Sequence, residues 1–209
     1  MTDRVHDYHE GNRYFHDRFD TRRLADRAVE VRNSDRFEDW AVEVIADANM
    51  FFLATCDHRG LPTCSYKGGE RGFVRVLDER VLAFPNYDGN GRYLSMGNLR
   101  VNPNVGMLFI DFEGRRRVRV QGTASIDESD DLMSEYPGAQ FIVRVHATEV
   151  FRNCPRYIHK YRFEETSEYV PAIDQEPPIP EWKFLPELNA YLPADDPARG
   201  KPPPGQDAT

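Results

Sequence analysis

The feature that most constrains this chain is a series of short apolar runs between residues 51 and 127. The first run starts at Phe51, and a turn at residues 57–60 ends it. Gly, Pro, Asn and Asp residues separate the later runs. Short apolar runs divided in this way are typical of consecutive β-strands. The pattern therefore predicts a mainly β fold, an antiparallel meander of six to seven strands that rolls into a small barrel.

Periodicity places the individual strands. We expect them near residues 50–56, 61–67, 72–77, 80–85, 105–110, 116–126 and 141–151. The first is continuously apolar, which predicts a strand covered on both faces. In residues 116–126 the side chains alternate, with Val118 and Val120 on one face and Arg117 and Arg119 on the other. This strand is expected to pack one face against the core and to expose the other.

Helices are expected to flank the strands. Four segments have helical composition or spacing: residues 20–32, 34–48, 90–101 and 130–136. Ser34 or Asp35 can cap the second helix, whose apolar residues recur on one face. Asn90 can cap the third helix, and Asn102-Pro103 ends it, because a residue before proline resists the helical region.

Composition divides the chain of 209 residues into three parts. Residues 1–33 form an N-terminal arm and helix, residues 34–161 the barrel domain, and residues 162–209 a proline-rich C-terminal extension. His6 and His9 lie in the arm, and nothing else in the sequence supports a metal site there. We therefore predict no metal ion.

Charge and cysteine content exclude several classes of protein. The formal net charge of −8 argues against general binding to nucleic acid or to an anionic membrane. No apolar run approaches the roughly 20 residues that span a bilayer, and the N-terminus lacks a signal-peptide core. Three cysteines without CxxC spacing predict neither a disulfide framework nor a zinc site, so a cytoplasmic location is expected.

The loop at residues 88–92 has the composition of an anion site. Its glycines let backbone amides approach a ligand, and a following helix would add unpaired N–H groups. Arg92 supplies a forked donor suited to phosphate. Asn90-Gly91 in this loop is also the commonest type of hairpin turn. The loop is therefore either an anion site or a simple hairpin turn.

Other arginines and one cysteine allow two interpretations each. Arg75 lies in an apolar strand and faces either solvent or a ligand. The dense cluster at residues 115–119 either neutralises a dianion or pairs with the acidic surface of another subunit. Cys154 is a structural thiol, or one whose pKa the neighbouring Arg156 lowers. No common nucleophile, metalloprotease or nucleotide-binding motif occurs, and the catalytic residues are left unassigned.

Taken in order, these segments resemble the pyridoxamine 5′-phosphate oxidase-like family of FMN-binding split barrels. The likeness runs from about Phe51 to Cys154. It comprises the turn at residues 57–60, the strand at 72–78, and Phe84-Pro85-Asn86 followed by the loop at 89–92. It continues through the later Asn-Pro pair and ends in the stretch from Arg119 to Ala124.

The resemblance implies a homodimer with a non-covalently bound FMN at each subunit interface. It also implies which residues contact the cofactor: Arg71, Gly72, Phe73, Val74, Arg75, Pro85, Asn86, Asn90, Arg92, Arg117 and Arg119. Within this set, Asn90 and Arg92 would bind the 5′-phosphate. Arg117, with Arg119 beside it, would reach the flavin of the other subunit.

The sequence departs from the family pattern at two places. Gly91 replaces one of two adjacent basic residues in the phosphate corner, and the C-terminal Trp and Arg that bind the vitamin substrate are missing. The expected function is therefore FMN-dependent oxidoreduction of an unidentified small molecule in an uncharacterised branch of the family. The alternatives are a barrel that binds deazaflavin or haem, and a non-catalytic flavin-binding sensor.

Overall fold

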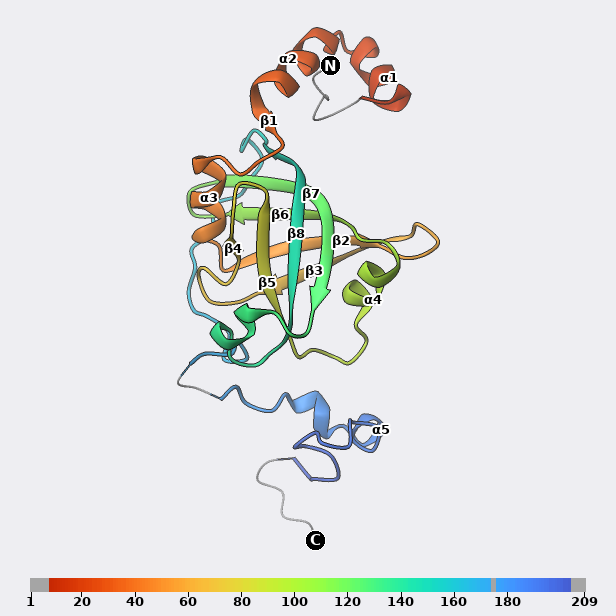
Figure 1. The fold of residues 1–209 in the computed structure, drawn as a ribbon, viewed down its shortest axis with the longest axis vertical. Coiled ribbons are helices and arrows are strands. Elements are labelled where there is room, and N and C mark those ends of the chain that lie inside the picture. The colour runs from red at the N-terminus through yellow and green to blue at the C-terminus, as the bar shows by residue number, and fades with distance from the viewer. Residues whose placement is uncertain (1–7, 174–175, 204–209) are drawn as a thin grey trace. The chain divides into compact units, whose positions relative to one another are not determined.

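The structure is a computed structural model that describes residues 8–173 and 176–203. The chain divides into two compact units, Met1–Glu165 and Thr166–Thr209. Figure 1 shows the ribbon, with the sheet in the first of these units.

One eight-stranded sheet forms the body of the first unit, and all of its strand pairs are antiparallel. The strands are β1 Asn33–Ser34, β2 Met50–Cys56, β3 Pro62–Gly68, β4 Arg75–Val76, β5 Val81–Tyr87, β6 Asn104–Asp111, β7 Arg116–Asp127 and β8 Ala139–Arg152. The main order is β3-β2-β6-β7-β8-β5-β4, and β1 pairs with β8. The mainly β, antiparallel fold is confirmed; the two-residue β1 brings the strand number to eight rather than six to seven.

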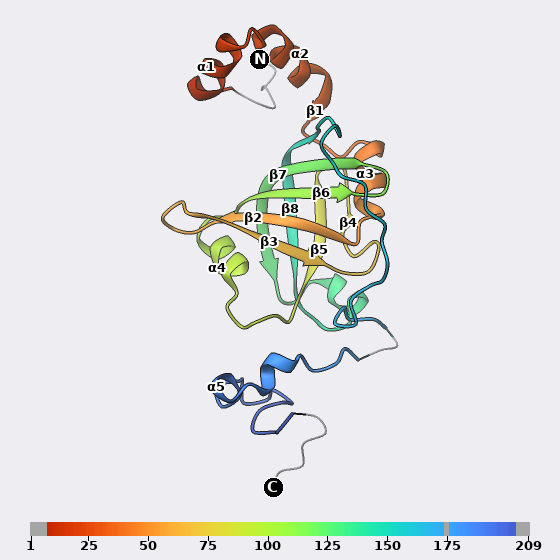
Figure 2. The same ribbon diagram turned by 180° about the vertical axis from the view of Figure 1, so that it is seen from behind.

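The sheet bends sharply across itself. In Figures 1 and 2, β2, β3 and β6 run across β5 and β8, while β7 begins beside β6 and then turns to follow β8. The register between β7 and β8 shifts between Gln121 and Gly122. A Cβ at Gly122 would lie 2.2 Å from the carbonyl oxygen of His146, so only glycine fits at this close approach.

The core lies inside this bent sheet, and alternating side chains supply it. On β2, Phe51 and Leu53 are fully buried, whereas Ala54 is exposed. The expectation that this strand is covered on both faces is met only in part, because Met50, Phe52 and Cys56 on the outer face are half-buried and Ala54 is exposed. On β7 the predicted alternation is confirmed, with Val118 and Val120 fully buried.

The helices of this unit are short. They are α1 Glu10–Arg18, α2 Arg22–Arg32, α3 Asp39–Ala46, α4 Leu94–Val101 and the 3-10 helix η1 Asp131–Glu135. α3 buries Ala41, Val44 and Ile45 against the core. The predicted cap at Ser34 or Asp35 is wrong: Ser34 belongs to β1, and Glu38 precedes α3. In α1, the ring nitrogen Nδ1 of His9 accepts from the amide of Gly11 at 3.1 Å, whereas His6 lies outside the described residues.

The segment before β4 differs from its predicted strand at residues 72–77. Only Arg75 and Val76 are paired in the sheet. Phe73 and Val74 are buried in the core, and Phe73 stacks on Phe51 with ring centroids 5.8 Å apart. Gly72 has a φ of +81°, which ends any extended run before Phe73. The apolar residues that suggested a strand instead fill the core from a loop.

The second unit is held by a buried polar network. It contains the 3-10 helix η2 Glu181–Phe184 and the short helix α5 Pro186–Asn189. The ammonium of Lys183 lies 2.8 Å from a carboxylate oxygen of Asp196, and both side chains are largely buried. The side-chain amide of Asn189 donates to the carbonyls of Lys183 and Ala198, each at 2.8 Å. These contacts order a proline-rich segment that has few apolar residues to bury.

None of the helices in the described ranges is both long and apolar enough to cross a bilayer. Cys56, Cys64 and Cys154 are all free thiols.

Candidate functional site: a cleft between β3 and the 87–96 segment

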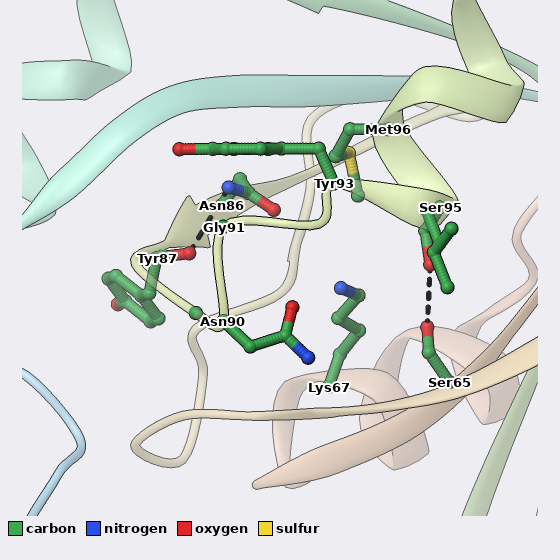
Figure 3. Close-up of a pocket in the computed structure, with 11 residues that line it drawn as sticks. Ser65, Lys67, Asn86, Tyr87, Asn90, Gly91, Tyr93, Ser95 and Met96 are labelled. Carbon is green, nitrogen blue, oxygen red and sulfur yellow. Dashed lines mark hydrogen bonds between the residues drawn. The ribbon is translucent and has the colours of Figure 1, made fainter. Parts of the chain in front are cut away.

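A cleft of about 280 Å³ lies where β3, the end of β5 and the start of α4 meet (Figure 3). Its lining comes from two stretches of the chain, one on β3 and one from the end of β5 into α4. These residues are Ser65, Lys67, Asn86, Tyr87, Gly89, Asn90, Gly91, Tyr93, Leu94, Ser95 and Met96. The cleft is thus built where residues about 20 to 30 positions apart in sequence are brought together.

Strand alternation orients the two β3 side chains. Ser65 and Lys67 are two positions apart, so they project to the same side of the strand. The hydroxyl of Ser65 lies 2.9 Å from that of Ser95 in the first turn of α4. Deeper in the same region, the side-chain amide of Asn98 donates to the hydroxyls of Thr55 and Thr63 at 3.0 and 3.2 Å. These bonds fix α4 against β2 and β3, and with it one wall of the cleft.

The loop after β5 forms the opposite wall. Gly91 has a φ of +70°, a conformation that glycine adopts without strain. The side-chain oxygen of Asn90 accepts from the amide of Arg92 at 3.2 Å and closes the turn. Asn90 therefore caps this turn and not the helix, and the predicted helix start is wrong. α4 begins at Leu94.

Tyr93 immediately precedes α4 in a left-handed conformation, with φ 47° and ψ 32°. This conformation is uncommon for a residue with a side chain, and such strain is concentrated at ligand sites. The Tyr93 hydroxyl donates to the side-chain oxygen of Gln140 at 3.1 Å, and the same oxygen accepts from Asn86 at 3.0 Å. As Figure 3 shows, the Tyr93 ring consequently lies across one side of the cleft.

Lys67 is the only lysine or arginine among the residues that line the cleft. Its side chain is half-buried, and burial lowers the pKa of its ammonium group. Within the described parts of the chain, this ammonium group has no ion pair and no hydrogen bond. Figure 3 shows its ammonium extending into the same space as the Asn90 amide. A cation in this position is stabilised by a bound anion.

Tyr87 is the second titratable group of the cleft. Burial, followed by the proximity of Tyr136 and Glu70, raises the pKa of Tyr87 to about 12. Its phenol therefore stays protonated near neutral pH and adds no negative charge that would oppose an anion. With the Lys67 ammonium, the loop amides and the N-terminus of α4, the cleft has the properties of a phosphate site.

The structure brings only some of the predicted cofactor residues to this cleft. Asn86 and Asn90 line it, and Arg92 follows in the loop with an exposed side chain. Pro85 is buried in β5 and does not line the cleft.

The predicted residues of the 71–75 segment lie elsewhere. Arg71 pairs with Asp47 at 2.5 Å, while Gly72, Phe73 and Val74 belong to the loop that fills the core. Arg75 pairs with Glu135 at 2.5 Å and stacks on the Tyr136 ring, 4.9 Å from its centroid. None of these five residues is among those that line the cleft beside Asn90.

Arg117 and Arg119 point away from the core on β7. A guanidinium nitrogen of Arg117 donates to the carbonyl of Cys154 at 3.0 Å, and Arg119 stacks on Phe151. Neither lines the cleft of its own chain. Cys154 is exposed, and its pKa is lowered by a backbone hydrogen bond with Arg156 and by the charges of Arg156 and Arg117. Of the two interpretations of Cys154, the structure supports the thiol with a lowered pKa.

Sequence reasoning missed Ser65, Lys67, Tyr87, Tyr93 and Ser95. The alternation of 61–67 carried a signal for the first two, since a serine and a lysine share one face of an expected strand. No local pattern marks Tyr93. In the parts of the chain that the structure describes, no group of three or more His, Cys, Asp or Glu side chains is arranged to hold a metal ion.

The bent antiparallel sheet and its flanking cleft define a split-barrel protein. Residues 37–162 match the family model described as pyridoxamine 5′-phosphate oxidase. The match covers more than half of the chain, which therefore belongs to this family. No curated protein sequence matches the chain.

Several solved structures are similar to this chain. A candidate pyridoxamine 5′-phosphate oxidase from Lactobacillus delbrueckii is 24% identical, with 58% of this chain and 99% of that one covered and a TM-score of 0.48. HupZ from Group A Streptococcus has 19% identity, coverages of 56% and 93%, and a TM-score of 0.45. HutZ, the heme storage protein from Vibrio cholerae, is 19% identical, with 56% of this chain and 95% of that one covered and a TM-score of 0.41. These chains are nearly fully covered, whereas a large part of this chain is outside each alignment.

Proposed function

We propose that this protein binds FMN in the cleft between β3 and the 87–96 segment, and that it is a flavin-dependent oxidoreductase acting on a small molecule. Family membership supports a flavin. The observation that carries the proposal is the half-buried Lys67 ammonium, which lines the cleft beside a glycine-rich loop without an anionic partner in the described chain. The FMN phosphate would supply the missing negative charge.

The residues of the cleft fit such a ligand. Lys67 and the amides of the 89–91 loop would bind the phosphate, and Arg92 at the mouth would add a second positive charge. The Ser65 and Ser95 hydroxyls are within reach of a polyhydroxylated chain because they line the same wall. Asn86 supplies a side-chain amide already oriented by Gln140.

A bound flavin would itself supply the electron transfer, so the protein needs no strong acid or base. The role of this chain is then to bind and orient. Tyr93 and Gln140 would limit access of water from one side, since their hydrogen bond spans the wall in which the Tyr93 ring lies. The neutral Tyr87 phenol would donate a hydrogen bond without repelling the phosphate.

We further propose that the protein acts as a homodimer. A cleft of about 280 Å³ is slightly smaller than the usual ligand pocket of roughly 300–1,000 Å³, so a second copy would complete the enclosure. Three free thiols are compatible with a cytoplasmic location, which we also propose.

The test is the identity and affinity of the cofactor. Mass spectrometry and a visible spectrum of the purified protein distinguish FMN from deazaflavin and haem. FMN titration into the apoprotein should show weaker binding to Lys67→Met than to wild type, by about 1.5–3 kcal/mol, the scale of a charged hydrogen bond. Lys160→Met, which removes an exposed lysine outside the cleft, is the matched control. Equal affinity in the two variants would contradict the site.

Activity needs a separate measurement. Rapid mixing of the FMN-loaded protein with nicotinamide nucleotides, followed by candidate acceptors, reports reduction and reoxidation. A flavin that stays oxidised with each reductant would indicate a sensor instead of an oxidoreductase.

A further inference from the structure

A second cavity, of about 460 Å³, lies on the other side of β3. It is bounded by residues 47–50, by the end of β6 and by residues 161–165. Tyr66 lines it, whereas the neighbouring residue Lys67 lines the cleft described above, because consecutive residues of a strand project to opposite faces. The volume is within the usual range of small-molecule pockets, and the cavity is separate from the proposed flavin site.

Aromatic rings form much of its wall. They belong to Tyr66, Phe112, Tyr161 and Phe163. Tyr66 is 62% exposed and Tyr161 57% exposed, so a ligand in the cavity can reach both side chains. Aromatic side chains gathered in a hollow and left exposed are a feature of recognition sites, because they bury a large area when a ligand stacks on them.

The wall is organised before any ligand arrives. The amide of Tyr161 donates to the carbonyl of Phe112 at 3.3 Å, and the two rings meet edge to face with centroids 5.2 Å apart. Arg71 pairs with Asp47 at 2.5 Å and lies over the Phe163 ring, 5.8 Å from its centroid. These contacts hold residues 161–163 to the barrel, so a ligand would not have to order this segment.

Charge around the cavity favours a cation. Its lining contains four carboxylates and two guanidinium groups: Asp47, Asp111, Glu113, Glu165, Arg71 and Arg162. Arg71 neutralises Asp47, and Arg116 bonds Asp111 at 2.8 Å. Glu113 has only a 3.9 Å contact with Arg71. The negative charges of Glu113 and Glu165 therefore exceed the one positive charge of Arg162. The faces of the aromatic rings add further attraction for positive charge.

We propose that this cavity is a second small-molecule site, which binds a flat aromatic compound carrying a positive charge. The aromatic wall provides stacking area, and the carboxylates of Glu113 and Glu165 provide the charge preference. The proposal does not depend on flavin binding, because the two sites lie on opposite faces of β3.

Isothermal titration calorimetry of the full chain with three probes that share a phenyl ring tests this site. Benzyltrimethylammonium carries a positive charge, benzyl alcohol is neutral, and phenylacetate is negative. We expect the cation to bind most tightly and phenylacetate most weakly, with the cation favoured over the alcohol by roughly 2- to 30-fold, the range of a cation–π contact. Tyr66→Ala should lower the affinity for the cation by about fivefold or more. Glu113→Gln should reduce the ratio of the affinity for the cation to the affinity for the alcohol.

Tyr157→Ala is the matched control, because Tyr157 is 86% exposed and does not line the cavity. Its affinity for the cation should equal that of wild type. Lys67→Met should also leave binding unchanged, so loss of the flavin site and loss of this one are distinguishable. The proposal is overturned if the cation shows no saturable binding, if phenylacetate binds equally well, or if Tyr66→Ala binds the cation as wild type does.

Discussion

The hydroxyl groups of Ser65 and Ser95 lie 2.9 Å apart, and this contact joins the edge strand β3 to the first turn of α4. Ser95 is only 7% exposed, so its hydroxyl has little access to water. The hydrogen bond therefore fixes α4 against β3 within one wall of the proposed flavin cleft.

Removing both of these hydroxyls should cost less unfolding free energy than the sum of the two single removals. Ser65→Ala leaves the buried Ser95 hydroxyl without its partner, at a cost of about 1–3 kcal/mol of unfolding free energy. The double variant Ser65→Ala/Ser95→Ala should be less destabilised than the sum of the single variants. Urea unfolding of all four proteins gives the coupling energy. Strict additivity would show that the two hydroxyls do not depend on one another.

The stability of the apoprotein should depend on the charge of Lys67. Burial lowers the pKa of this ammonium in the folded protein below the ordinary value of 10.5. The folded state thus loses its proton before the unfolded state does, and the destabilising charge is fully present below the folded pKa. Wild type should gain stability relative to Lys67→Met as pH rises toward 10.5. Urea unfolding across this range measures the difference, which saturating FMN should diminish by supplying a counter-ion.

Arg92 should contribute to cofactor affinity from the mouth of the cleft. Arg92→Ala is expected to weaken FMN binding by roughly 1.5–3 kcal/mol, since it removes a charged donor next to the Asn90 turn. Arg100→Ala, an exposed arginine later in α4, should bind FMN as wild type does. Calorimetric titration compares them. Unchanged affinity in Arg92→Ala would mean that Lys67 and the loop amides suffice.

The two glycines of the loop should differ in their tolerance of alanine. A Cβ at either Gly89 or Gly91 would meet nothing within 4 Å, but only Gly91 has a positive φ, of +70°. Gly91→Ala should therefore lower the unfolding free energy by about 1–2 kcal/mol through backbone strain alone. Gly89→Ala should be near neutral. Thermal unfolding of the two variants is the measurement, and equal losses would argue against the loop conformation.

A larger loss is expected at the bend of the barrel. In Gly122→Ala the new Cβ would lie 2.2 Å from the His146 carbonyl oxygen, so the backbone of β7 or β8 must shift. We expect a loss of roughly 3 kcal/mol or more, at or beyond the upper end of overpacking costs. Gly106→Ala places its Cβ 3.7 Å from the Ala54 side chain, an ordinary contact, and should be tolerated. Denaturant unfolding distinguishes them, and similar stabilities would contradict the close approach.

Local pattern was sufficient for most of the strands, residues 72–77 excepted. The first expected strand, residues 50–56, coincides with β2, and the alternation in residues 116–126 assigned the two faces of β7 correctly. These predictions succeed because strand periodicity depends only on neighbouring residues. The two wrong helix starts have a similarly local cause. Ser34 and Asn90 have capping side chains, but Ser34 pairs in a strand and Asn90 closes a turn.

Contacts between distant segments could not be predicted in this way. The sequence left open whether Arg75 faces solvent or a ligand. In the structure its guanidinium group pairs with the carboxylate of Glu135, 60 residues away. Lys67 looked like an ordinary strand lysine, and it becomes a candidate ligand group only because β3 lies beside the 87–96 segment.

The amino-acid sequence by itself determined that the chain forms an antiparallel barrel, and its motifs identified the family. The tertiary structure alone decided which charged side chains stay unpaired and which cleft or cavity they line. The physical reason is range: backbone periodicity is set by adjacent residues, whereas the desolvation and pairing of a charge depend on groups that folding brings together from far along the chain.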